Sequence, residues 1–178
     1  MTAAPVGVQR RSDPRSLTVV AAFAAGGALC GVAARAWMRL ISSDPEFTWS
    51  GTLFIVALFA VVGTAQGCAV AVRRRTRWVR GPARVVAGVA ALLLGAGPGM
   101  VLLPLLVCAP LAIARTRWHP VIRGGLALVA CANAVLMLPL LHSDLAWGRT
   151  IVGWLAMLAL YGVIVTGLSV NLRPVRAA

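Results

Sequence analysis

The chain has little charge, and almost none of it is negative. Only 12% of its 178 residues are charged. The four acidic residues are Asp13, Asp44, Glu46 and Asp144, and the 17 basic residues are all arginine, with no lysine. About a quarter of the residues in a soluble domain are charged, and disordered segments are polar and poor in apolar residues. The composition therefore excludes both classes, and a hydrophobic content of 60% favours a membrane protein.

Signatures of catalysis and metal binding are also missing. No Walker A loop, GxGxxG, HExxH or GxSxG appears, and the apolar runs contain no Asp or Glu that could act as nucleophile or proton relay. The cysteines, Cys30, Cys68, Cys108 and Cys131, stand singly in apolar runs without CxxC or Cys/His spacing. They are expected to be small buried apolar side chains. We expect no catalytic residue, no metal, no cofactor and no enzymatic activity.

Long apolar runs separated by short polar segments predict the topology. The runs at 17–41, 51–72, 124–141 and 150–170 each suit a membrane helix, which needs about 20 residues. The run 85–114 would form a helix about 45 Å long, against a hydrocarbon core of about 30 Å, and the Gly95–Gly99 segment interrupts it. We therefore predict an all-α transmembrane bundle of about six spans, or five spans with a re-entrant hairpin at 85–114.

The distribution of arginine predicts how this bundle is oriented. With six spans, every arginine except Arg35, Arg39 and Arg149 lies on one face, which the positive-inside rule assigns to the cytoplasm. We predict a multi-pass protein of the bacterial cytoplasmic membrane with both termini cytoplasmic. Residues 1–16 would form a flexible tail, 17–171 one transmembrane domain and 172–178 a second tail. The arginine-rich face should attract anionic lipids, and the lack of a basic soluble domain argues against nucleic acid.

Two arginines interrupt this trend near the predicted outer end of the first span. Arg35 and Arg39 are four residues apart and share a helix face, and Asp44 and Glu46 follow in the next loop. One interpretation is a site that handles or gates an anion at the outer mouth. The other is an interfacial ion-pair cluster that holds the first span and its loop in place.

A few uncharged polar and small residues stand inside the predicted spans. Gln66 and Asn133 each need a hydrogen-bond partner there, so they either line a substrate path or join neighbouring helices. The Gly27-xxx-Gly31 and Gly63-xxx-Gly67 pairs allow close helix approach. We expect these glycines to pack spans of one chain together.

One segment carries a resemblance. The stretch WMRLISSDPEFTWSGTLFIV, residues 37–56, resembles a segment of a family of small multi-span membrane proteins of high-G+C bacteria. The resemblance implies a membrane location, and it implies no activity and no functional residue. From the residues themselves we favour a small transporter or channel-like protein. The alternative is a non-catalytic scaffold or accessory subunit, with a homo-oligomer or another membrane protein as possible partner.

Overall fold

The structure is a computed structural model, and it describes residues 14–42, 48–72, 77–93, 101–142 and 147–173. Six helices and no strands occur in these ranges: α1 (Pro14–Ile41), α2 (Trp49–Ala71), α3 (Arg77–Leu93), α4 (Leu103–Ala114), α5 (Pro120–His142) and α6 (Trp147–Leu172). The predicted all-α bundle is confirmed, with helices in the predicted order. The loop acids Asp44 and Glu46, and also Asp13 and Asp144, lie outside the described residues.

The six helices fall into two length classes. Helices α1, α2, α5 and α6 have 23 to 28 residues and are apolar enough to cross a membrane, so this is a multi-pass membrane protein. Helix α3 has 17 residues and α4 has 12, which correspond to lengths of about 26 and 18 Å. The described residues thus contain four helices that are long and apolar enough to cross a membrane. The remaining two helices, α3 and α4, are shorter over the residues that the structure describes.

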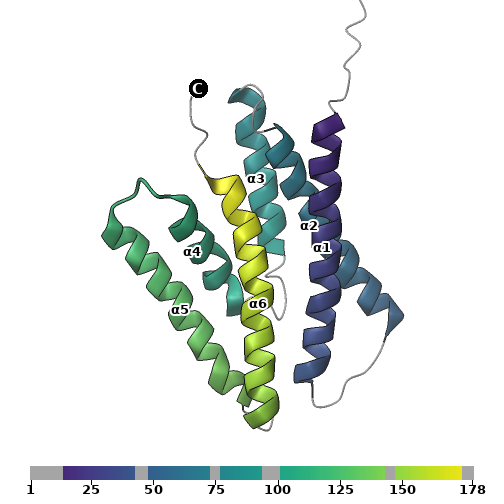
Figure 1. Cartoon of the computed structure of the whole chain (residues 1–178), viewed down its shortest axis with the longest axis vertical. Helices are drawn as coiled ribbons and strands as arrows, with labels where there is room; N and C mark the ends of the chain where they lie inside the picture. Colours follow the sequence, from purple (N-terminus) through teal and green to yellow (C-terminus); the bar gives the residue numbers. More distant parts are fainter. Residues whose placement is uncertain (1–13, 43–47, 73–76, 94–100, 143–146, 174–178) are drawn as a thin grey trace, which may run out of the picture.

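Figure 1 shows how the short helices fit among the long ones. Helix α1 begins, and helix α6 ends, at the same end of the bundle, which we call the terminal end. Helix α3 starts at the terminal end and ends partway along the bundle (Figure 1). Helix α4 starts inside the bundle and runs back toward the terminal end. The two short helices therefore have the arrangement of a re-entrant hairpin, the alternative predicted for 85–114.

Several helices begin earlier than the apolar runs do. Helix α1 begins at Pro14 and α5 at Pro120, because proline fits the first turn of a helix, where its missing N–H costs nothing. Helix α3 begins at Arg77, inside the basic cluster, and continues through Pro82. Arginine is a good helix former, so the cluster extends a helix that the apolar pattern places only from Val85.

Helices α1 and α2 are held together by four glycines. A Cβ at Gly27 would overlap the Phe59 carbonyl oxygen, and a Cβ at Gly63 would overlap that of Phe23. At Gly31 and Gly67, a Cβ would lie 2.8 Å from Val56 Cα and 2.9 Å from Val20 Cα. Apolar burial drives helix association weakly in lipid, so this backbone contact is the main attraction available. The prediction that these glycines pack spans of one chain is confirmed.

A second packing centre joins α4, α5 and α6. Leu102, Leu105, Ala130, Met137 and Met157 form its buried core. Two tryptophans at its edge donate hydrogen bonds to backbone carbonyls of other helices. Trp37 Nε1 of α1 donates to Gly153 O of α6 at 2.7 Å, and Trp154 Nε1 donates to Ala134 O of α5 at 2.8 Å. These bonds satisfy the indole N–H groups and fix the helices to one another.

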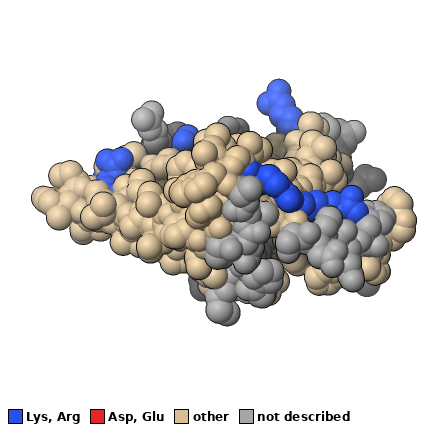
Figure 2. Space-filling view, turned by 90° about the horizontal axis from the view of Figure 1, so that it is seen from below, with Lys and Arg blue, Asp and Glu red and all other residues tan. Residues whose placement is uncertain are grey.

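The outside of the bundle is apolar. Leu29, Val121 and Leu128 are each at least 70% exposed, and Figure 2 shows arginine side chains separated by broad uncharged surface. All four cysteines are free, but Cys68 and Cys131 are exposed. Cys30 and Cys108 are half-buried, so none of the four cysteines is fully buried as expected. A membrane helix exposes small apolar side chains to lipid at no cost, because lipid tails are as apolar as a protein core.

Candidate functional site

A buried polar contact joins two amide side chains near the terminal end. Gln66 of α2 and Asn171 of α6 are each 5% exposed. Asn171 Nδ2 donates to the backbone oxygen of Gln66 at 3.2 Å and also to its side-chain Oε1. Gln66 Nε2 donates to Ala87 O of α3 at 2.7 Å. We call Gln66 and Asn171 the amide pair. It joins three helices that are distant in the sequence, so Gln66 serves as an interhelical contact.

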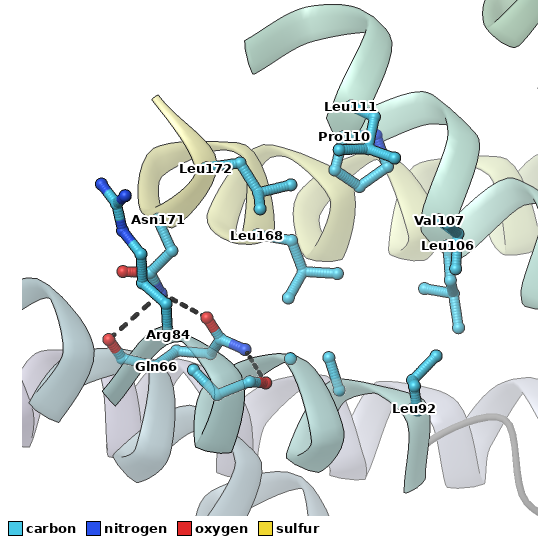
Figure 3. Close-up of a pocket in the computed structure, with 13 residues that line it drawn as sticks. Gln66, Arg84, Leu92, Leu106, Val107, Pro110, Leu111, Leu168, Asn171 and Leu172 are labelled. Carbon is cyan, nitrogen blue, oxygen red and sulfur yellow. Dashed lines mark hydrogen bonds between the residues drawn. The ribbon is translucent and has the colours of Figure 1, made fainter. Parts of the chain in front are cut away.

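An apolar cleft opens beside the amide pair. Its volume is about 260 Å³, and residues of α2, α3, α4 and α6 line it. Figure 3 shows Gln66, Asn171 and Arg84 at one end and Leu92, Leu106 and Val107 at the other. Helix α3 packs mainly on α2, and α4 packs on α5 and α6. The cleft exists because α3 and α4 have different packing partners.

Arg84 stands at the mouth of this cleft. Its side chain is partly buried, and its Nη2 donates to Arg173 O, just beyond α6, at 3.3 Å. Together with the amide pair, this bond links α3 to the end of α6. The cleft thus has a polar, positively charged end at the terminal end of the bundle and apolar walls below it (Figure 3).

A second apolar space lies on the other side of Gln66. It has a volume of about 310 Å³ and is lined by α1, α2 and α6, with Gly26, Gly27, Gly63 and Gly167 in its walls. Gln66 borders both spaces. Gln66 therefore contacts two apolar spaces, and Asn171 lines only the first of them.

Asn133 has a different role from Gln66. It lies in the middle of α5, and its Nδ2 donates to Val101 O, just before α4, at 2.9 Å. Its Oδ1 is inaccessible and has no hydrogen-bond partner. Backbone groups at a helix break inside a membrane need such partners, so Asn133 anchors the start of α4. Asn133 does not line the cleft, and the two predicted intramembrane polar residues do not share one path.

The predicted outer cluster is only partly described. Arg35 is partly buried, and its Nε donates to Thr52 Oγ1 of α2 at 3.2 Å, while Arg39 is exposed. Asp44 and Glu46 lie outside the described residues, so the ion-pair interpretation and the anion interpretation both stay predictions. The contact with Thr52 is one way in which Arg35 holds the first span against the second.

Two further arginines contact helix ends in ways that the sequence pattern did not reveal. Arg149 Nη2 donates to Leu40 O at 2.8 Å and to Ser42 O at 3.2 Å, at the end of α1. Arg123 Nε donates to Ala112 O near the end of α4 at 3.1 Å. Cations favour helix C-termini, where carbonyl groups lack helical partners.

Asn171 was also missed by the sequence analysis, because it stands at the edge of the last apolar run, where polar residues are common.

Metal-binding side chains do not gather in the described part of the chain. No three residues among His, Cys, Asp and Glu lie together there. His119 precedes α5 and His142 ends it, so α5 separates the two rings along its length. His142 packs on Trp147 with ring centroids 3.9 Å apart.

Comparison of this chain with protein-family models, with curated proteins and with solved structures finds no match.

Proposed function

We propose that this protein is a small, non-catalytic transport protein of the bacterial cytoplasmic membrane. Its working region would be the cleft between two helical units, α1–α3 and α4–α6. The single observation that carries the proposal is the pair of short helices, α3 and α4. Helix α3 runs inward from the terminal end, α4 runs back toward it, and the two pack on different partners (Figure 1). Discontinuous helices at membrane depth are a common feature of transporters.

The chemistry of the cleft favours an apolar or amphiphilic cargo. Its walls are leucine, valine, alanine, glycine and proline, and its few polar groups are at the mouth. The amides that could have lined an aqueous path, Gln66 and Asn171, hydrogen bond to each other. A channel for ions needs polar or charged groups along its length. This bundle fits lateral entry from the membrane better than passage through a water-filled pore.

The orientation proposed here places the terminal end in the cytoplasm. Arg15, Arg84, Arg115, Arg117, Arg123 and Arg173 all belong to segments at that end, and Arg35, Arg39 and Arg149 belong to the opposite end (Figure 1). The positive-inside rule assigns the first group to the cytoplasm.

A second candidate function is a static scaffold or accessory subunit. The amide pair and Asn133 favour it, because each uses its hydrogen bonds to join helices within the chain. The two functions differ in whether the α1–α3 and α4–α6 units move relative to each other.

Distance measurements between spin labels in lipid nanodiscs test this difference. In a protein with its native cysteines replaced by alanine, labels at Gly81→Cys in α3 and Arg117→Cys after α4 report across the cleft. Both positions are exposed. Transport predicts two distance populations, since alternating access moves one unit against the other.

The control pair is Leu17→Cys in α1 with native Cys68 of α2 retained. Both sites are exposed, and they lie in the two helices joined by the glycine contact. It should give one narrow distance in every condition. One narrow distance for both pairs would favour the scaffold over the transporter.

A further inference from the structure

We infer that the cleft binds one anionic phospholipid, with an acyl chain between α3 and α4 and the headgroup phosphate at Arg84. This inference deepens the proposed function and rests on it for its biological meaning. The binding of the lipid follows from the shape and charge of the cleft.

The apolar part of the cleft fits a hydrocarbon chain. From Arg84 to Leu92 the α3 wall is eight residues long, which is about 12 Å, and small residues, Ala87, Gly88 and Ala91, form its middle. Leu106, Val107 and Leu111 face them from α4. Neither wall offers a polar side chain along this length (Figure 3). Water would lack the two or more polar partners that it needs there.

The polar part of the cleft lies where a lipid headgroup would lie. Gln66 is five residues from the end of α2, and Asn171 is one residue from the end of α6. Arg84 is the charged residue in the cleft lining. The arrangement, a cation at the membrane surface above an apolar slot, is complementary to an amphiphile with a negative headgroup and an apolar tail. Basic pockets between membrane helices bind anionic headgroups in this way.

The positive charge of the arginine side chains favours a lipid with a negatively charged headgroup. The chain carries a net charge of +13, and arginine is the sole charged residue type in the described ranges. A guanidinium group recognises phosphate through directed N–H donors. A zwitterionic headgroup would add a cation beside Arg84 and the nearby Arg173, so phosphatidylglycerol should be favoured over phosphatidylcholine.

Native mass spectrometry of the detergent-purified protein tests this assignment. Dioleoyl phosphatidylglycerol and dioleoyl phosphatidylcholine are added separately, and the fraction of protein carrying one lipid is compared. We expect the wild type to prefer phosphatidylglycerol about tenfold and Arg84→Gln to lose that preference. Arg117→Gln is the matched control, because it removes the same charge from an exposed turn at the same end. Equal losses in both variants would mean general surface attraction and would overturn the proposal.

The tail is tested separately from the headgroup. Gly88 lines the cleft and has open space around a Cβ, and Gly81 of the same helix also has open space but does not line it. Gly88→Phe should lower occupancy by both lipids at least fivefold, and Gly81→Phe should leave it unchanged. Unchanged binding in a folded Gly88→Phe protein would mean that no chain lies between α3 and α4. Glycerol phosphate, the headgroup without a tail, should not bind.

A crosslinking experiment covers the case in which a variant does not fold. Phosphatidylglycerol with a diazirine near the end of one acyl chain is bound to the wild-type protein and irradiated. Peptides from α3 and α4 should carry the label, and labelling spread evenly over the exposed faces of α1 and α5 would overturn the proposal. Phospholipid bound in the cleft with a single spin-label distance would contradict transport and leave this inference intact. Two spin-label distances without a preference for phosphatidylglycerol would support transport and overturn this inference.

Discussion

Helices α1 and α2 and helices α3 and α4 are neighbouring pairs in one bundle, and they are built in opposite ways. The first pair consists of full-length spans whose glycines bring the two backbones into contact. The second pair consists of short helices that pack on other helices and leave a cleft of about 260 Å³ between them. In a membrane, where apolar burial alone does not hold helices together, the backbone contact makes one pair rigid. Helices α3 and α4 have few contacts with each other, and each is held by the helices on which it packs.

The largest expected effect comes from breaking the rigid pair. Gly27→Leu places a side chain against the Phe59 backbone, so the helices must separate, and we expect a loss of about 3 kcal/mol in the free energy of unfolding. Unfolding in detergent mixtures with increasing sodium dodecyl sulfate measures it. Gly26→Leu is the control, because a Cβ at Gly26 meets nothing within 4 Å. If both variants unfold at the same point, the backbone contact is not what holds α1 to α2.

A smaller effect should follow from releasing α3. Gln66→Leu removes the bond to the Ala87 carbonyl and the side-chain bond from Asn171, which keeps the Gln66 backbone oxygen as acceptor, and we expect a loss of about 2 kcal/mol. Thr64→Val is the matched control in the same helix, since Thr64 Oγ1 donates to its own helix at Ala60 O. The same unfolding measurement should show a clear difference between the two variants. An equal change would mean that the amide pair contributes nothing beyond an ordinary polar contact.

The corresponding change on the α4 side should cost less. Asn133→Leu removes one hydrogen bond, from Nδ2 to Val101 O, and it also removes the unpartnered Oδ1, so the net loss should be about 1 kcal/mol. The effect should be local. Hydrogen exchange in nanodiscs should rise at the start of α4 and stay unchanged in α1 and α2. Uniform exchange along the chain would contradict a local anchor.

The smallest expected effect is an increase in the free energy of unfolding. Gly88→Ala adds a methyl group in open space on α3, where the higher helix propensity of alanine should stabilise the protein by about 0.5–1 kcal/mol. Gly124→Ala in α5, also in open space, should act alike. A destabilising Gly88→Ala would show that α3 and α4 approach each other more closely than the cleft implies.

The sequence alone determined the class of this protein, the order of its helices and the glycines at which its spans pack together. Runs of apolar residues can satisfy their backbone groups in lipid only as helices, and GxxxG spacing allows close approach in any helix pair. It also marked Gln66 and Asn133 as polar groups in need of partners. These conclusions depend on composition and local spacing, which a sequence carries directly.

The tertiary structure alone decided where the half-length helices end, which groups satisfy Gln66 and Asn133, and where the cleft lies. Residues 85–114 suit two short spans or a re-entrant hairpin equally, because both bury the same apolar side chains. Asn171 and Ala87 lie 105 and 21 residues from Gln66, and no local pattern links positions so far apart. The cleft is the space left between helices that pack mainly on other helices. Its lining residues come from four helices, so no local sequence pattern reveals it.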